Sequence, residues 1–140
     1  MSDVARWEHF PHQSDVGVRG IGASLAEALA QAALALTAIV TEIERVRAAA
    51  AVEIRCRASD PEMLLVEWLD AVIYEMATRR MLFSRYDVRV AGHALEATAW
   101  GEPVDVARHE PAVEVKAATM SALRVAPRDG LWTAECVVDV

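Results

Sequence analysis

The sequence predicts an α+β fold: one two-layer domain over residues 1–140, with two helices packed on one face of a largely antiparallel mixed sheet. Two segments repeat their apolar residues with the period of a helix, and most of the remaining chain alternates apolar and polar residues in short runs between turn signals. With 140 residues, of which 54% are hydrophobic, the chain is large enough to bury a core without disulfides or a structural metal.

The first helix is expected over residues 24–40. Ser24 and Glu27 have the spacing of a capping box, in which each side chain hydrogen-bonds a free backbone N–H at the start of the helix. One face of this segment is apolar and carries Leu25, Leu29, Ala32, Leu36 and Ile39. This face should pack against the sheet.

The second helix is expected within "SDPEMLLVEWLDAVIYEMATRR", where Asp60 is suited to cap the helix and Pro61 to occupy its first turn. Its apolar stripe consists of Leu65, Trp68, Leu69, Val72 and Met76. Trp68 lies in the middle of this stripe and is therefore expected in the core.

The rest of the chain has the alternation of strands. The segment 51–58 is the first such run, and two further runs flank Gly92 and His93, which suit a hairpin turn. Three more strands are expected over residues 112–117, 121–126 and 131–140, with the last two joined through a tight turn at Asp129-Gly130.

Composition excludes several classes of function. The net charge of −7 and the pI near 5.0 argue against direct nucleic-acid binding, which needs clustered lysine and arginine. The longest apolar segment is too short and too interrupted to span a membrane, and the first ten residues do not resemble a signal peptide, so we expect a cytoplasmic protein. Cys56 and Cys136 form no C-x-x-C pair and are expected to be buried, reduced thiols.

Polar residues that interrupt the apolar pattern are the candidates for chemistry. Asp15, Asp139 and the terminal carboxylate or carbonyl of Val140 would supply hard oxygen ligands, which suit calcium or magnesium. His12 could add a nitrogen ligand or orient a carboxylate. The alternative interpretation of "HQSD" is an Asx-type turn beside a surface histidine, with Asp139 solvated near the chain end.

Catalytic motifs are missing. The chain has no G-x-S-x-G sequence, no histidine next to a cysteine and no phosphate-binding loop ending in Gly-Lys-Ser/Thr. A metal-dependent hydrolase that uses His12, Asp15 and His109 is the alternative, although it would lack the convergent ligands that such sites usually have.

Four stretches resemble the archease family, in the same order and over nearly the full length. They are "HQSDVGVRG", "LLVEWLDAVIYEM" followed by "LFSR", "GEPVDVARHEPAVEVKAAT" and "VVDV". The resemblance implies a small acidic cytoplasmic protein with a metal site and no catalysis of its own. It implies an accessory role for the tRNA-splicing RNA ligase that joins a 3′-phosphate end to a 5′-hydroxyl end, in which the protein promotes guanylylation and turnover of the ligase. Some members of the family are linked to tRNA methyltransferases.

By position, the resemblance assigns the metal ligands to Asp15, Asp139 and Val140, with calcium as the expected cation and magnesium as the alternative. It places His12, His109 and Lys116, the only lysine of the chain, near the metal or in contact with the partner. The chain departs from the family pattern at Gln13 and Ser14, where threonine and alanine are usual, and at Met120, where tyrosine is common.

Overall fold

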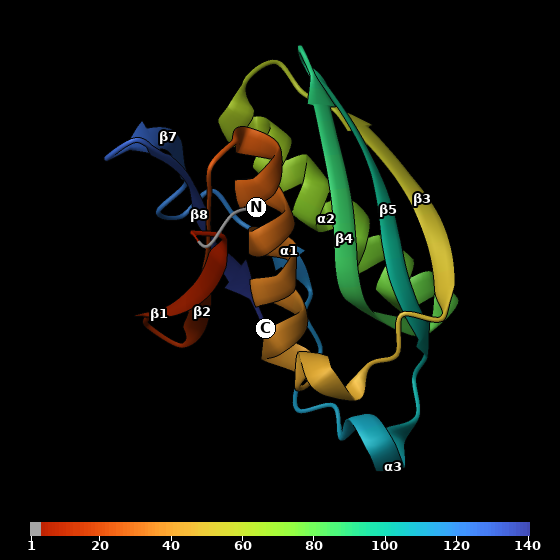
Figure 1. The fold of residues 1–140 in the computed structure, drawn as a ribbon. Helices are drawn as coiled ribbons and strands as arrows, with labels where there is room; N and C mark the ends of the chain where they lie inside the picture. The colour runs from red at the N-terminus through yellow and green to blue at the C-terminus, as the bar shows by residue number, and fades with distance from the viewer. Residues whose placement is uncertain (1–3) are drawn as a thin grey trace.

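Two antiparallel sheets enclose two long helices in the computed structural model, which describes residues 4–140 (Figure 1). The larger sheet has the strand order β1 (Arg6–His12), β2 (Asp15–Gly22), β8 (Leu131–Asp139) and β6 (Ala117–Ala118), and β7 (Arg124–Arg128) also pairs with β8. The smaller sheet has the order β3 (Ala50–Arg57), β5 (Ala94–Pro103) and β4 (Met81–Ala91).

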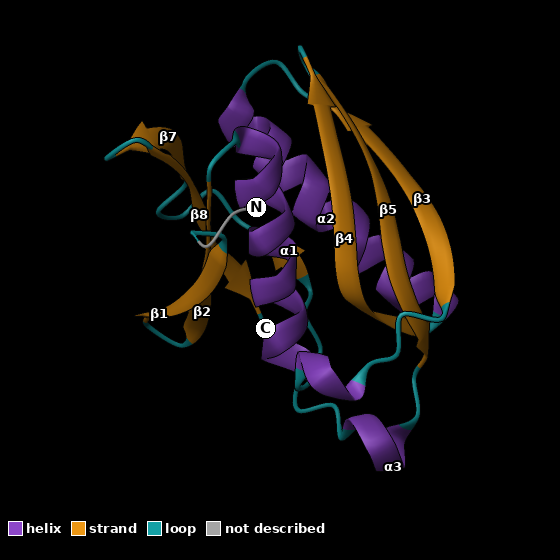
Figure 2. Cartoon of the chain, in the orientation of Figure 1, coloured by secondary structure: helices purple, strands orange, loops and turns teal. Residues whose placement is uncertain are grey.

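The α+β class is confirmed, and every strand pair is antiparallel. The structure differs from the expected layering in one respect. The strands divide into two sheets, and the helices α1 (Leu25–Val40) and α2 (Pro61–Arg79) lie between them (Figure 2). The helices therefore have apolar contacts on two sides, and the core is one continuous cluster that includes residues from both sheets.

Both predicted helix starts are confirmed. Ser24 Oγ accepts the N–H of Glu27 at 3.1 Å, and Glu27 Oε1 accepts the N–H of Ala23, the residue before the cap, at 2.6 Å. Asp60 Oδ1 accepts the N–H of Met63 at 2.8 Å, with Pro61 in the first turn. Arg80 ends α2 in the left-handed conformation, with φ of 53°.

Because Gly20 of β2 has no side chain, α1 approaches the larger sheet closely. A Cβ atom on Gly20 would lie 2.0 Å from Ala28 O and 2.3 Å from Ala32 N. The backbone of β2 thus packs directly on α1. On the opposite side of α1, the Thr37 and Tyr86 hydroxyls hydrogen-bond at 2.8 Å, which joins the helix to β4.

The hairpin turns lie where the sequence predicts them. Gly92 has φ of 61° between β4 and β5, and Asp129 and Gly130 have φ of 53° and 79° between β7 and β8. The strand expected over residues 112–117 is mostly absent, because only Ala117 and Ala118 pair in the sheet. Two short helices were not predicted, η1 (Ile43–Arg45) and α3 (Val106–His109). Within residues 4–140, no helix combines the length and apolar character needed to cross a membrane.

Candidate metal centre

The "HQSD" segment is a tight hairpin turn between β1 and β2. His12 pairs with Asp15 across the turn, and Gln13 takes φ of 55°, in the left-handed region. A turn was one interpretation of this segment, and half of a binding site was the other. The turn is confirmed, and it places an imidazole and a carboxylate as neighbours at one end of the larger sheet, while the binding site stays a prediction.

Strand register brings the end of the chain to the same place. Val16 pairs with Val138, so continuing the register by one residue sets Asp15 opposite Asp139. Directly opposed residues of an antiparallel pair point to the same face, with Cβ atoms about 4.5–5.5 Å apart. The continued register thus brings the two predicted carboxylate ligands to the same end of the sheet, although they lie near opposite ends of the sequence.

This face of the sheet lies away from the helices. Val18 and Gly20 of β2 face α1, as do Cys136 and Val138 of β8, all of which are buried. On the other face, Asp15 and Asp139 are half-buried, whereas Gly17, Ile21, Thr133 and Val137 are buried. The two aspartates are therefore among the partly exposed positions of this face.

Lys116 lies at the same edge. Its N–H donates to Asp139 O at 2.9 Å, and the next residue, Ala117, pairs with Asp139. The adjacent Ala118 N–H donates to Asp70 Oδ1 of α2 at 2.8 Å, which attaches this short segment to the helix. The Lys116 side chain is exposed. Sequence reasoning did not identify Asp70, whose position in the helix gives no sign of a contact with β6.

The donors present fit a hard cation. Asp15 and Asp139 supply two facing carboxylates, His12 a neighbouring imidazole, and Val140 a main-chain oxygen directly after Asp139. Within the described part of the chain, neither aspartate forms an ion pair with a basic residue. The same part of the chain contains no group of three or more His, Cys, Asp or Glu side chains arranged around a metal position. Main-chain oxygen and water would therefore have to complete the coordination of an ion.

His109 belongs to a separate cluster. Its ring is buried, Nδ1 accepts the N–H of Asp105 at 2.8 Å, and Nε2 lies 2.9 Å from Glu102 Oε2. Because Nδ1 accepts a hydrogen bond, Nε2 carries the proton and donates it to the carboxylate. Both nitrogens are therefore engaged, and this geometry gives no support to a role for the ring as a ligand. The structure brings Asp15, Asp139, Val140, His12 and Lys116 together and places His109 among different partners.

Glu102 is the centre of this second cluster. It accepts the N–H of Arg47 at 2.8 Å, the His109 ring N–H at 2.9 Å and an Arg108 guanidinium N–H at 2.6 Å. These donors, led by the Arg47 N–H, lower the pKa of Glu102 to about 2. The cluster fixes the loop around α3 to the segment that follows η1. Sequence reasoning missed it, because its members are separated in the chain and carry no motif.

The fold and the site define an acidic α+β protein with a hairpin turn and a terminal strand that together present two carboxylates. The model of the archease protein family (MTH1598/TM1083) matches residues 7–140. The chain belongs to the archease family.

Relatives and solved structures agree with this assignment. Protein archease of Pyrococcus abyssi is 34% identical over 98% of this chain and 100% of its own length, and that of Thermococcus gammatolerans is 35% identical with the same coverage. The solution structure of protein 1598 of Methanobacterium thermoautotrophicum has a TM-score of 0.84 at 31% identity, covering 96% of this chain and 98% of its own. The crystal structure of a Thermotoga maritima archease, described as a possible chaperone, has a TM-score of 0.63 at 16% identity, covering 95% and 96% of the two chains, and shows the fold alone.

Proposed function

We propose that this protein is a metal-binding accessory factor that promotes guanylylation and turnover of the tRNA-splicing RNA ligase. The observation that supports the proposal is the register of β2 and β8, whose continuation by one residue beyond Val16 and Val138 would bring the half-buried Asp15 and Asp139 opposite each other. A cation held there would be accessible to the active site of a partner. Membership of the archease family and the description of a structural relative as a possible chaperone support an accessory role.

The residues have distinct roles in this proposal. Asp15, Asp139 and the main-chain oxygen of Val140 bind the cation, with calcium expected and magnesium as the alternative. His12 orients Asp15 or adds a ligand. Lys116 contacts a phosphate of the nucleotide or an acid of the partner as a flexible positive charge. The bound cation supplies charge neutralisation, while the partner supplies the chemistry of guanylylation.

Calorimetric titration with calcium and with magnesium tests the metal centre. We expect Asp139→Asn to weaken calcium binding by more than about tenfold, since loss of groups that only support a metal ligand already costs about 10–100-fold. The fold should be retained, because asparagine keeps the shape and removes the charge. Asp87→Asn is the matched control, because Asp87 is exposed on β4 of the other sheet. Wild-type protein that binds neither ion, or an Asp139→Asn variant that binds as well as wild type, would end this assignment.

A second assay separates the accessory role from metal binding. Purified 3′-phosphate RNA-splicing ligase is loaded with guanylate, with and without this protein, and the rate and the number of turnovers are measured. We expect acceleration by the wild type and by Asp87→Asn, and none by Asp15→Asn. If the protein binds calcium but does not change the rate or the turnovers of the ligase, the ligase is not its partner. A tRNA methyltransferase would then be the partner to test.

A further inference from the structure

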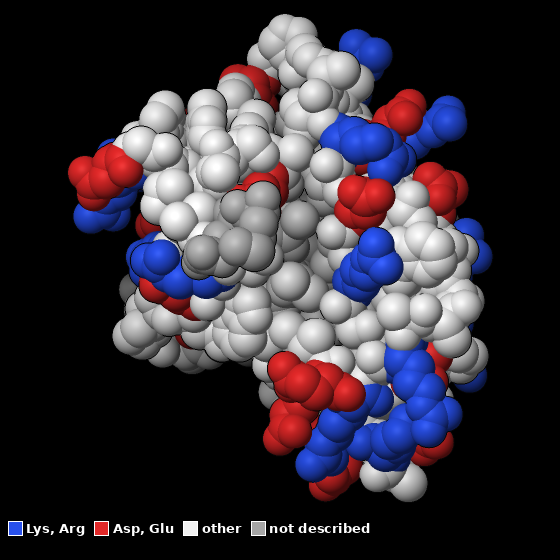
Figure 3. All heavy atoms as spheres, in the orientation of Figure 1, with Lys and Arg blue, Asp and Glu red and all other residues white. Residues whose placement is uncertain are grey.

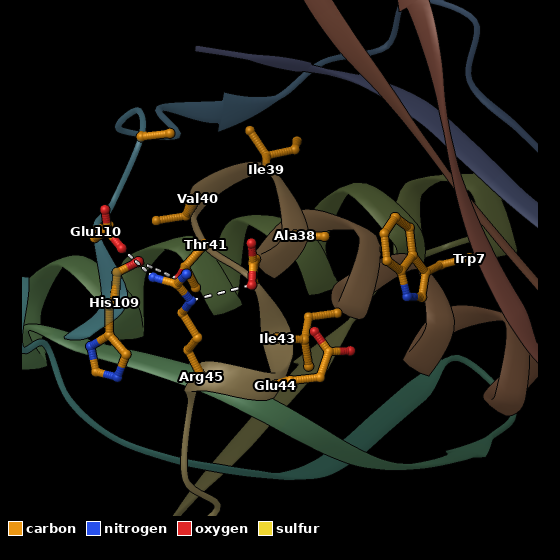
Figure 4. Close-up of a pocket in the computed structure, with 12 residues that line it drawn as sticks. Trp7, Ala38, Ile39, Val40, Thr41, Ile43, Glu44, Arg45, His109 and Glu110 are labelled. Atoms are coloured by element: carbon orange, nitrogen blue, oxygen red, sulfur yellow. Dashed lines mark hydrogen bonds and ion pairs between the residues drawn. The ribbon is translucent and has the colours of Figure 1, made fainter.

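A second concave site lies at the carboxyl end of α1. It is a cavity of about 420 Å³ between Trp7 of β1, the last turn of α1, the η1 turn and the residues that follow α3 (Figure 4). None of the predicted metal ligands lines it, although the backbone around His109 forms one wall. Thr41 Oγ1 donates to His109 O at 2.6 Å, so the wall is fixed to the end of α1.

The floor of the cavity is apolar. Ile39 and Val40 of α1 and Ile43 of η1 contribute aliphatic side chains, and Trp7 stands at one end of the cavity (Figure 4). Trp7 is 37% exposed, and its ring packs on His9 with 5.0 Å between the ring centroids. An exposed indole that is held in place provides a flat surface on which an alkyl chain or a cation can pack.

Carboxylates form the rim. Glu42, Glu44 and Glu110 all line the cavity, against a single guanidinium, that of Arg45. Arg45 is already engaged by Glu42 at 3.2 Å, by Glu110 and by the Arg108 carbonyl at 3.3 Å. Glu44 forms no ion pair within residues 4–140, and it is exposed beside Ile43 on the side of the cavity toward Trp7 (Figure 4).

The end of α1 adds to the negative character of this site. The carboxyl end of a helix carries a partial negative charge, and α1 has no basic residue in its last turn. On the surface near the lower end of α1, acidic side chains lie beside a group of basic ones (Figure 3), and the excess of carboxylates is found in the lining of the cavity itself. The cavity thus combines an apolar floor and an exposed indole with an excess of negative charge.

We propose that this cavity docks a basic segment of a protein partner. The alkyl stem of an arginine or lysine would pack on Trp7 and Ile39, and its charged group would lie near Glu44 and the end of α1. An apolar residue next to it in the partner would cover Ile43. The charge of the cavity is complementary to such a segment, and the apolar floor selects it over a purely polar cation. This docking site is separate from the metal centre and does not depend on a bound ion.

Nuclear magnetic resonance of the ¹⁵N-labelled full chain, without added metal, tests the proposal. The probe is an N-acetylated and C-amidated peptide that alternates leucine and arginine. We expect the largest saturable shifts at the Trp7 indole and at the backbone amides of Ile43 and Glu44. Glu44→Gln should weaken binding about two- to fivefold, the range of a single exposed ion pair. Glu67→Gln, on an exposed position of α2, removes the same charge elsewhere and should leave the affinity unchanged.

Three results would overturn the proposal. Equal binding of a peptide with glutamate in place of arginine would show that charge does not matter. Shifts confined to residues 12–15 and 139–140 would place the contact at the metal centre. Equal occupancy by spermine at the same concentration would identify a site for small polyamines. Because no metal is present, these results leave the calcium titration unaffected, so the two proposals fail separately.

Discussion

Trp68 shows at the scale of one residue how the two helices are held together. Its side chain is fully buried, and its indole Nε1 donates to Leu29 O of α1 at 2.9 Å. The ring also meets Tyr86 of β4 edge-on, with 5.8 Å between centroids. This side chain of α2 thus contacts both α1 and the smaller sheet. Its position in the apolar stripe was enough to predict its burial.

Replacing Trp68 should be costly. Trp68→Ala is expected to lower the free energy of unfolding by about 3–5 kcal/mol, because it leaves a cavity in a packed core. Trp68→Phe should cost less, since it keeps most of the apolar volume and removes the hydrogen bond to Leu29. Urea denaturation measures both values. A Trp68→Ala midpoint close to that of the wild type would contradict the packing described above.

The two thiols should be unreactive in the folded protein. Burial raises the pKa of Cys136 to about 12 and that of Cys56 to about 11, so thiolate is scarce at pH 8. We expect iodoacetamide to label neither residue quickly in the native state and both after denaturation, as read by mass spectrometry. Rapid native labelling of Cys136, which is fully buried, would contradict the position of β8 against the core.

At the scale of elements, the start of α1 is a local structure that the sequence specifies. Ser24→Ala removes the acceptor for the Glu27 N–H and should lower the free energy of unfolding by about 0.5–2 kcal/mol. Ser24→Asp restores a capping oxygen and should recover most of the loss. Ser59→Ala, at an exposed position next to the cap of α2, is the control. Equal stability of the Ser24→Ala and wild-type proteins would show that the Ser24 cap contributes nothing.

The stability of the protein should fall in acid when the Glu102 carboxylate, which fixes the loop around α3, is protonated. The pKa of Glu102 is lowered from 4.5 to about 2 in the folded state, so the folded protein favours the charged form. The stabilisation is complete above pH 4.5 and is lost as the pH falls toward 2. Glu102→Gln should therefore be less stable than wild type at neutral pH, with a difference that shrinks on acidification below pH 4.5. Urea midpoints measured at several pH values test this, and a constant difference would contradict it.

Helices and hairpins could be predicted because their signals are local. Ser24, Asp60, Gly92 and the Asp129-Gly130 pair each lie where their chemistry indicates. The division into two sheets could not be predicted, because alternation identifies the face on which a residue lies and not the neighbouring strand. The candidate metal residues came from the polar interruptions of the apolar pattern and from the resemblance to a family, and the sequence alone could not show that β2 pairs with β8.

At the scale of the molecule, the two candidate sites use different parts of the fold. The carboxylates of the metal centre lie on the outer face of the larger sheet, and the docking cavity lies at the carboxyl end of α1. Both are acidic, in keeping with the net charge of −7. A basic partner would be attracted to either surface, and the association should slow as salt is added.

The whole protein is expected to have no catalysis of its own. The sequence lacks a nucleophile motif and a phosphate loop. The alternative hydrolase would use His109 together with His12 and Asp15, but both ring nitrogens of His109 already form hydrogen bonds. Purified protein with calcium, magnesium or manganese should therefore release no phosphate from RNA ends, nucleotides or simple phosphoesters above the rate without protein. The decisive comparison uses Asp15→Ala together with Asp87→Ala as a control at the other sheet. Release that persists through purification, disappears in Asp15→Ala and remains in Asp87→Ala would establish a metal-dependent hydrolase and replace the accessory role.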